Sequence, residues 1–570
     1  MRRNAVYFSM AAVLTTTLLF NTGTATNAED GKINRSTVKK KENKLATSNP
    51  HPEFSWGNSG PVSPVLHPGS VKGAGMVEEP LLEIDSVIEE MIENGTMPGA
   101  VTFVARRGHI VQHEAYGQAV LYSDDTGTEV ENPISMDKDT IFDLASISKI
   151  FTTTAAMMLY EDGHFDLDDP VATYIPEFAQ NGKGDVTIRQ LMTHTSGFTA
   201  WVPLYTIGKS REDRIQYVFQ YPLANSPGTK YTYSDLNMIT LGEIIERISG
   251  KGLDKYIKEK ITGPLDMKDT MYNPTAELKM RIAATEYQPG INRGLVWGEV
   301  HDENAWSLDG VAGHAGVFST ANDLAKLAHM YVNDGRYGDK QLLQPETVQL
   351  LVENQIPEFP GNDHGLGWEL SQMWYMDGLS EASTLGHTGY TGTSIVINKN
   401  NDTIAILLTN RVHPTRATVS TNPARRQFAQ QVADAIPVSM PNKKDGAWFS
   451  GYGGLLDRTL TGEVHLETDA TLSFDTWYRT EQGYDFGVVE VSSDGVNWNT
   501  VVDPYTGSSI DWQSDEARIP AGTTHIRFRY DTDTYNNGRG WYVANLKLTG
   551  LGNESLPLDV SGDGWTKRNY

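Results

Sequence analysis

The chain contains no cysteine among its 570 residues. This absence excludes disulfides, thiolate metal ligands, cysteine nucleophiles and lipid attachment through an N-terminal cysteine. It also means that cysteine usage carries no information about the redox compartment. Basic residues are scarce relative to acidic ones, 47 against 72, so the formal net charge is −25. An acidic chain repels phosphate backbones, which argues against a nucleic-acid partner.

Long apolar runs are also scarce, and the one that stands out lies at the N-terminus. The basic segment MRRN precedes the apolar run 5–20, and small residues follow it up to Ala28. This order is typical of a secretory signal. The alternative is an uncleaved membrane anchor, but the run is short against the ~20 residues of a membrane span. The sequence therefore predicts a signal peptide at 1–28, an extracellular or cell-wall-associated protein, and no transmembrane segment after signal removal.

Patterning along the rest of the chain predicts an α+β domain over 79–438. The preceding segment 29–78 has no sustained period and predicts a flexible linker. The domain opens with a helix over 81–95 and two strands that turn at Arg107-Gly108, and it closes with two strands that turn at Asn400-Asn401 and a helix. We therefore expect one antiparallel sheet, built from both ends of the domain and flanked by helices, with an all-helical region inserted.

Composition changes again across a short predicted linker, 439–446. Beyond it helical periodicity disappears, apolar and polar residues alternate, and Asp494-Gly495 gives a hairpin signal. These features predict an all-β sandwich over 447–552, of a size ordinary for one domain, followed by a tail at 553–570.

A Ser-x-x-Lys pattern, Ser146 to Lys149, opens a predicted helix that ends at Gly163. A serine there lies among the free N–H groups of the helix N-terminus, and a lysine one turn on shares its face. A neutral lysine can accept the serine proton, whereas a charged lysine can hold a second base deprotonated. The alternative is a serine that merely caps the helix. Because Ser36 and Lys39 match the same pattern with nothing around them, the pattern alone decides nothing.

Two later stretches supply the missing partners. Tyr233 lies just before a predicted helix, and a tyrosine hydroxyl near a lysine can serve as general base and then general acid. His387 and Thr388 lead into a predicted strand and offer hydrogen-bond donors to a substrate carboxylate, while Gly389 permits close approach of a ligand. Taken singly, each stretch is more often packing or a turn.

In this order, Ser-x-x-Lys, Tyr-x-Asn-like and His-Thr-Gly resemble the motifs of the serine penicillin-recognising enzymes, and 79–438 resembles the class C β-lactamase-like family. That family includes D-alanyl-D-alanine carboxypeptidases, D-aminopeptidases and some esterases. The resemblance implies a β-lactamase/transpeptidase-like fold, a small-molecule or peptide substrate, and no required cofactor or metal in this domain. It also implies site roles: Ser146 as acylated nucleophile, Lys149 and Tyr233 as proton carriers, main-chain N–H groups of Ser146 and Tyr390 as the oxyanion hole, and Asp235, His387, Thr388 and Gly389 as substrate-binding residues.

Two positions depart from the β-lactamase pattern. His387 stands where lysine is usual, and because histidine is partly charged near neutral pH, its hold on a carboxylate should weaken as pH rises. Asp235 stands where asparagine is usual, which removes an amide donor. These departures argue against strong β-lactam binding and favour a peptide, ester or cell-wall substrate. We expect a D-alanyl or related cell-wall peptide. A carboxylesterase and then a β-lactamase are the alternatives, and a non-catalytic wall-binding protein is the rival outside catalysis.

The C-terminal sandwich resembles the jelly-roll domain of immune-inhibitor-A-like secreted metalloproteases, which is similar to carbohydrate-binding modules. This resemblance implies contact with peptidoglycan or carbohydrate. Trp477, Trp498 and Trp541 could stack on sugar, although core packing is the commoner use of tryptophan. Acidic loop residues are more often simply solvated, but four of them could supply oxygen ligands for structural calcium: Asp475, Asp485, Asp531 and Asp533.

Overall fold

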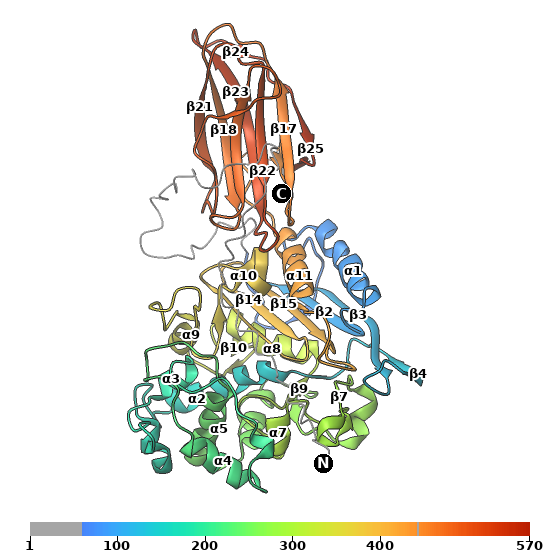
Figure 1. Ribbon diagram of the computed structural model, residues 1–570, viewed down its shortest axis with the longest axis vertical. Coiled ribbons are helices and arrows are strands. Elements are labelled where there is room, and N and C mark those ends of the chain that lie inside the picture. The colour runs from blue at the N-terminus through green and yellow to red at the C-terminus, as the bar shows by residue number, and fades with distance from the viewer. Residues whose placement is uncertain (1–59, 442–443) are drawn as a thin grey trace, which may run out of the picture. The chain divides into compact units, whose positions relative to one another are not determined.

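A computed structural model describes residues 60–441 and 444–570 (Figure 1). The predicted signal peptide and residues 29–59 of the predicted linker lie outside the described residues. Within the described part, none of the helices has the length and apolar character needed to cross a bilayer.

One sheet joins both ends of the first domain, as the strand patterns predict. β2 (Gly99–Arg106) pairs on one side with β3 (His109–Tyr122) and on the other with β15 (Thr403–Thr409), so strands from opposite ends of the domain are direct neighbours. All pairs are antiparallel except β1 with β3. The sheet continues from β15 to one edge through β14 (Ser394–Asn398), β13 (Thr384–Thr388) and β12 (Glu369–Leu370), and beyond β3 it adds β1 (His67–Pro68) and β4 (Glu129–Ser135).

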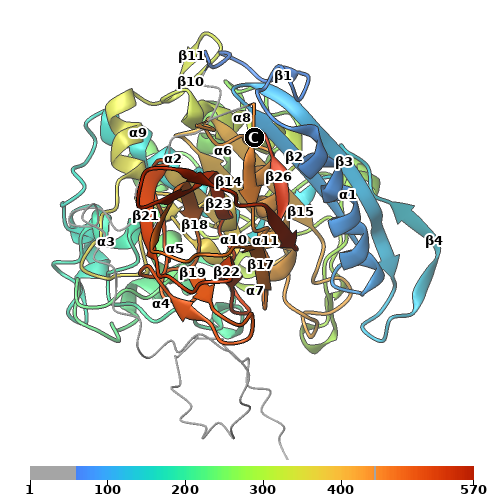
Figure 2. The ribbon, with the colours of Figure 1, turned by 90° about the horizontal axis from the view of Figure 1, so that it is seen from above.

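Helices cover the two faces of this sheet. α1 (Glu78–Glu93) and α11 (Asn422–Asp434) share one hydrophobic cluster with alternate residues of β2 and β15, while α8 (Ala321–Val332) packs against the residues in between (Figure 2). This division follows from the period of two in the strands, which sends neighbouring side chains to opposite faces. The predicted α+β architecture is therefore confirmed.

The inserted region is built around α2 (Ser148–Glu161) and α5 (Asp235–Ser249). α2 is buried on all sides, and α5 buries most of its residues against it. β5 (Phe142–Asp143) precedes α2 in the chain, and it forms a small sheet with the later strands β9 (Val317–Ser319) and β6 (Met271–Tyr272). The other helices are α3 (Ile188–Met192), α4 (Arg211–Gln220), α6 (Leu253–Ile257), α7 (Glu303–Ser307), α9 (Pro345–Val352) and α10 (Met373–Met376).

The C-terminal residues form two antiparallel sheets that enclose an apolar core. One sheet has the order β21-β18-β23-β16-β26, with β24 beside β23, and the other has the order β20-β19-β22-β17-β25. Trp541 and Phe528 lie at the centre of the core between them. The strands are β16 (Ala447–Phe449), β17 (Asp457–Glu463), β18 (Ala470–Arg479), β19 (Phe486–Ser492), β20 (Asn499–Thr500), β21 (Gln513–Ile519), β22 (His525–Asp531), β23 (Gly540–Gly550), β24 (Ser555–Leu556), β25 (Val560–Asp563) and β26 (Thr566–Arg568).

Two segments predicted as linker and tail carry structure instead. Within 60–78, β1 pairs with β3, and the Arg107 side chain donates to the Ala74 carbonyl oxygen. Within 553–570, β25 pairs with β17 and β26 pairs with β16. Both segments also bury single apolar side chains, Met76 in the first and Trp565 in the second. Their strands are only two to four residues long, which is too short to show a hydrophobic period in the sequence.

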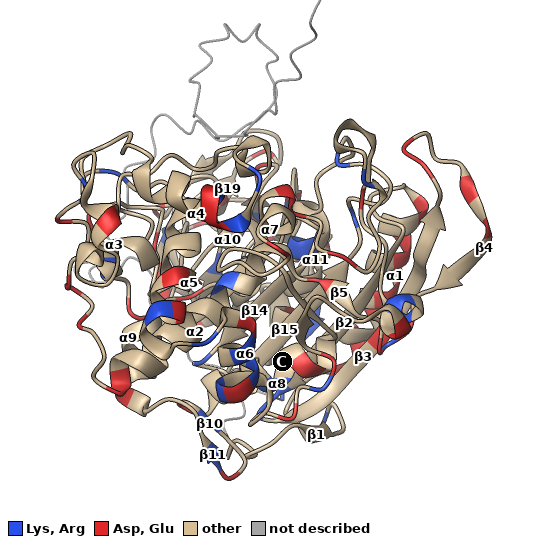
Figure 3. Cartoon of the chain, turned by 90° about the horizontal axis from the view of Figure 1, so that it is seen from below, with Lys and Arg blue, Asp and Glu red and all other residues tan. Residues whose placement is uncertain are grey.

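Acidic residues lie on many elements of the described chain. Figure 3 shows them on elements as far apart as α1, β4 and α4. In this view the acidic residues are therefore not confined to one element.

Candidate active site

Ser146 lies on a strained turn between β5 and α2. The preceding residue, Ala145, has a φ of +48°, a conformation that non-glycine residues rarely adopt. The Asp143 carboxylate holds this turn, because its two oxygens accept the Ala145 N–H at 2.8 Å and the His301 N–H at 2.6 Å. Burial raises the pKa of Asp143, and the two N–H donors oppose that rise. The turn presents a half-buried Ser146 at the N-terminal end of α2.

Lys149 is 1% exposed and directs its three N–H donors at fixed acceptors. Its Nζ donates to Ser146 Oγ at 2.9 Å and to the His314 carbonyl oxygen at 3.1 Å, and it forms an ion pair with Asp235 Oδ1 at 2.8 Å. Burial alone would lower the pKa of Lys149, but Asp235 and Tyr233 outweigh burial and raise this pKa. Lys149 is therefore an ammonium ion that points its charge at Ser146.

The Tyr233 side chain lies beside Lys149, whose Nζ is 4.8 Å from the centre of the tyrosine ring. The Tyr233 hydroxyl is buried and has no hydrogen-bond partner among the described residues. Burial raises the pKa of Tyr233 to about 12, although Lys149 and Ser146 both act to lower it. The His194 ring centre lies 4.6 Å from that of Tyr233, and its Nδ1 accepts the Ser234 N–H at 3.1 Å, which fixes the loop that carries Tyr233.

Gly389 brings the third motif against the turn that carries Ser146. A Cβ at Gly389 would lie 2.4 Å from the Leu144 carbonyl oxygen, so a larger residue does not fit there. Thr393 Oγ1 donates to that same oxygen at 3.2 Å. The close approach predicted at Gly389 is therefore an approach of two main-chain segments, which places β13 beside the nucleophile.

The His387 ring is 1% exposed and is neutral in this setting. Burial, followed by the charge of Lys149, lowers the pKa of His387 to about 3. The expectation of a partly charged histidine near neutral pH does not hold here, because desolvation disfavours the imidazolium ion. The Nδ1 atom lies 2.8 Å from the Thr388 carbonyl oxygen, so Nδ1 carries the proton. The Nε2 atom presents a lone pair and has no partner among the described residues.

Tyr390 lies next in the chain and is 52% exposed. Its ring stacks on His301 with 5.7 Å between the ring centres. Within the described part of the chain, its main-chain N–H donates to no main-chain oxygen. The turn that contains Tyr390 is held by Arg425 of α11, which donates to the Gly389 and Thr393 carbonyl oxygens at 2.8 and 3.0 Å. Sequence reasoning missed Arg425, because it lies in an ordinary amphipathic helix.

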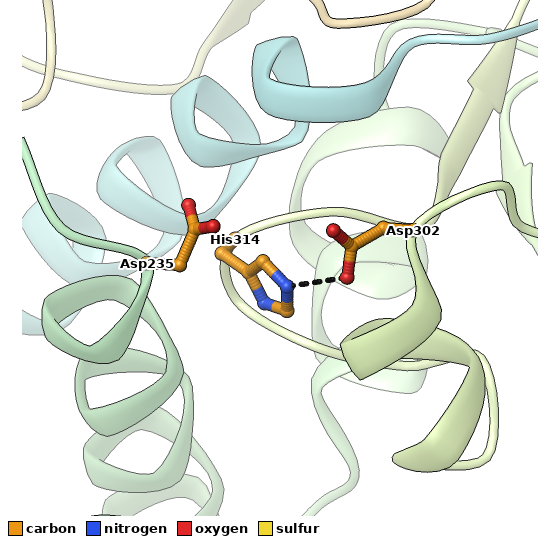
Figure 4. Close-up of side chains that lie close together, drawn as sticks. All are labelled: Asp235, Asp302 and His314. Atoms are coloured by element: carbon orange, nitrogen blue, oxygen red, sulfur yellow. Dashed lines mark hydrogen bonds and ion pairs between the residues drawn. The ribbon is translucent and has the colours of Figure 1, made fainter. Parts of the chain in front are cut away.

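A group of two carboxylates and one imidazole lies behind Lys149. One oxygen each of Asp235 and Asp302 and one nitrogen of His314 lie within 4.8 Å of one another (Figure 4). This spacing is compatible with a metal ion. However, Lys149 and His314 already supply N–H donors to the two carboxylates, so neither carboxylate needs an ion, while His314 Nδ1 has no hydrogen-bond partner among the described residues. Sequence reasoning missed Asp302 and His314, although the glycine-rich stretch 310–316 was a signal of close packing.

The sandwich residues singled out from the sequence separate into two kinds. Trp477 and Trp541 are 1% and 0% exposed and belong to the core, whereas Trp498 is half-buried under the Arg527 guanidinium.

The predicted calcium ligands were four aspartates, and Asp485 Oδ1 accepts the Asp533 N–H at 3.0 Å. Over the described ranges, no three of the four predicted calcium ligands come together as a ligand group: Asp475, Asp485, Asp531 and Asp533.

Comparison with known proteins identifies the family. A family model described as β-lactamase matches residues 84–430, more than half of the chain. The chain belongs to the β-lactamase family. It is 33% identical over 392 residues to an Escherichia coli (strain K12) protein named "Putative D-alanyl-D-alanine carboxypeptidase", covering 63% of this chain and 89% of that protein. A Salmonella typhimurium protein with the same name is 34% identical over the same shares.

Solved structures agree on the fold of this β-lactamase family member. EstCE1, described as "a hydrolase with promiscuous acyltransferase activity", matches with a TM-score of 0.50 at 22% identity, covering 62% of this chain and 99% of that chain. A penicillin-binding protein homolog from Caulobacter crescentus also matches with a TM-score of 0.50, at 18% identity, covering 63% and 99%. At these identities the two structures show the fold alone. Family and relatives together make the chain a serine hydrolase.

Proposed function

We propose that this serine hydrolase is exported and forms an acyl-Ser146 intermediate on D-alanyl or related cell-wall peptides. The observation that carries the proposal is the hydrogen bond from Lys149 to Ser146, with the Tyr233 hydroxyl buried nearby. Helix capping by a serine does not require a buried ammonium beside it, whereas activation of Ser146 as a nucleophile uses one. The names of the curated relatives support the substrate class, and the apolar run 5–20 supports export.

In the proposed reaction the proton of Ser146 passes to Tyr233. Lys149 has no lone pair to accept it. Burial raises the pKa of Tyr233, but the charge of Lys149 acts to lower that pKa, so Lys149 supports the minor phenolate form of Tyr233 that accepts the proton. Ser146 Oγ bonds to the substrate carbonyl carbon as its proton moves to the phenolate oxygen, and the main-chain N–H groups of Ser146 and Tyr390 receive the oxyanion.

The intermediate then breaks down in two steps. As the carbonyl re-forms, the leaving amine or alcohol takes the proton from Tyr233 and departs. Water then attacks the acyl-enzyme, gives one proton to the phenolate of Tyr233, and releases the acid product. Tyr233 returns that proton to Ser146 Oγ, so the protein regains its starting state.

A carboxylesterase is the second candidate, and the state of His387 favours it. A neutral ring that presents a lone pair at Nε2 offers neither a positive charge nor a donor to a substrate carboxylate. A peptide with a C-terminal carboxylate would therefore depend on Thr388 and on main-chain groups for its binding. An uncharged ester has no such need.

One experiment tests the reaction and separates the candidates. Purified protein and its Ser146→Ala variant are mixed with a fluorescent penicillin, a short-chain p-nitrophenyl ester and a peptide ending in D-alanyl-D-alanine. We expect the intact protein to gain an acyl mass on the tryptic peptide that contains Ser146, and we expect the variant to gain none. Equal labelling and turnover in both proteins would contradict an acyl-Ser146 mechanism, and turnover of the ester alone would favour the esterase.

For the C-terminal sandwich we propose contact with the cell wall. Its support is the jelly-roll resemblance together with the half-buried Trp498 beside Arg527, which leaves part of an aromatic face for a sugar. Retention on purified peptidoglycan is compared for the full chain and for a chain without residues 440–570. Unchanged retention after truncation would remove this role. The alternative of a purely non-catalytic wall binder predicts retention without acylation of Ser146.

A further inference from the structure

The loop 310–316 reaches Lys149 because glycines permit close packing. A Cβ at Gly313 would lie 2.0 Å from the Met238 carbonyl oxygen of α5. From the other side, Thr152 of α2 donates to the Gly313 carbonyl oxygen at 2.8 Å. The loop is thereby wedged between the two helices that carry the active-site side chains, and its next carbonyl oxygen, that of His314, accepts from Lys149.

The side chain of His314 is tied to Asp302. His314 is 1% exposed, and its Nε2 lies 2.8 Å from Asp302 Oδ1, which also accepts the Ala305 N–H at 2.7 Å at the start of α7. Burial alone would raise the pKa of Asp302, but His314 and the N–H hold it well below its usual range. Asp302 is therefore a carboxylate, and Nε2 carries a proton. His314 cannot rotate without losing a charge-assisted hydrogen bond.

A few contacts fix the direction in which the Lys149 ammonium points. Among the described residues the ammonium forms an ion pair with Asp235, and that carboxylate lies close to the second carboxylate, Asp302. Two like charges so close repel each other unless donors stand between them, and the His314 ring occupies that place (Figure 4). The other titratable groups that act on Lys149 or are acted on by it are Tyr233, His194, His387 and Glu369.

We propose that Asp302 and His314 are positioning residues for the proton transfer at Ser146. Asp302 fixes the His314 ring, and the fixed residue turns its carbonyl oxygen toward Lys149 while its ring screens Asp235 from Asp302. The ammonium is thereby held against Ser146 Oγ and Tyr233. This inference rests on the proposed acyl-Ser146 reaction, and it extends the active site to a pair that touches no reacting atom.

Variants of Asp302 can separate its contact with His314 from its role as the N-cap of α7. Serine caps a helix about as well as aspartate but is too short to reach His314, whereas asparagine keeps both the cap and an acceptor. We expect Asp302→Ser and His314→Ala each to lower kcat for p-nitrophenyl ester hydrolysis by about 10- to 100-fold, as when an outer partner of a reactive group is lost. Asp302→Asn and His314→Gln keep a hydrogen bond between the two positions and should retain most of the activity.

The pH profile distinguishes positioning from a merely structural role. When the ammonium is held loosely, the Tyr233 phenolate loses support, so the acid limb of kcat/KM should move to higher pH in Asp302→Ser, with little change in KM. Rates are normalised to the fraction of Ser146 that can be acylated. Asp309→Asn is the matched control, because it removes the same charge from an exposed residue that directly precedes the loop 310–316.

The outcomes decide between the two proposals. The double variant Asp302→Ser/His314→Ala should be no slower than the worse single variant, because the pair acts as one unit. An unmoved acid limb in Asp302→Ser, or a fully additive double variant, would overturn the positioning role and leave the acyl-Ser146 mechanism intact. Wild-type turnover by Ser146→Ala would instead overturn the mechanism itself.

Discussion

Two buried regions of this chain are filled with opposite kinds of side chain. Around Ser146 the interior holds charges, and Lys149 directs its donors at fixed acceptors. In the C-terminal sandwich the interior is aromatic and aliphatic, with Trp541 packed among Tyr505, Phe528 and Trp565. A substitution in the first region should therefore change the chemistry and spare the stability, and a substitution in the second should do the reverse.

The largest expected effect is at Ser146. Ser146→Ala removes the nucleophile and should lower turnover of any substrate by at least about 10⁴-fold, the scale seen when a nucleophile is deleted. The melting temperature should stay the same, because only one half-buried hydroxyl is lost. Ester hydrolysis and thermal unfolding are measured side by side. Ser36→Ala is the matched control, since it alters the second Ser-x-x-Lys pattern, and a loss of activity there would undo the assignment.

Trp541→Ala should have the reverse profile. The side chain is fully buried, and its Nε1 donates to Thr476 Oγ1 at 2.7 Å. The substitution should destabilise the sandwich by about 3–5 kcal/mol, as a large-to-small change in a packed core does. Ester hydrolysis per folded molecule should not change. Urea unfolding followed by circular dichroism measures the first effect, and Val496→Ala, at a residue 77% exposed, serves as control.

The sequence predicted those parts of the fold that have a hydrophobic pattern and missed those that depend mainly on main-chain pairing. β2, β3, β14 and β15 carry a period of two or continuous apolar runs, and α11 carries a helical stripe, so the joining of both ends of the domain was predictable. β1 and β25 were missed, because they pair through main-chain groups over a few residues. Such pairing depends on a neighbour that is already in place, and it leaves no pattern of its own.

The order of residues in the sequence predicted which side chains form the site. It did not predict their charge states or the residues that hold them in place. Ser146, Lys149 and Tyr233 are brought together as the three ordered motifs predict. The role of His194 in holding the Tyr233 loop follows from a hydrogen bond, and the neutral state of His387 follows from burial; no motif reports either of them. The roles given to these residues stay predictions until their variants are assayed.

Asp235→Asn should have an intermediate effect, and this effect is on the choice of substrate in the charged region around Ser146. The amide restores a donor and removes a negative charge beside Ser146, so acylation by penicillin, an anion, should rise relative to ester turnover. We expect a change on the order of 10-fold in that ratio, the worth of one hydrogen bond to a charged group. Stopped-flow labelling with fluorescent penicillin measures it, with Asp309→Asn as control. A ratio that falls would contradict repulsion between the Asp235 carboxylate and the anionic penicillin.

The smallest expected effect is the absence of a pH limb from His387. The folded-state pKa of His387 is lowered to about 3, below the ordinary value of about 6.5, so the ring is neutral in the folded protein throughout pH 5–8. The ratio of D-alanyl-peptide turnover to ester turnover should then stay flat across this window, since no charge on the ring appears or disappears. Because the unfolded chain binds the proton first, stability is instead lost as pH falls below about 6.5. A ratio that drops between pH 6 and 7 would show that His387 is charged when substrate is bound. That result would support a role for His387 in binding the substrate carboxylate.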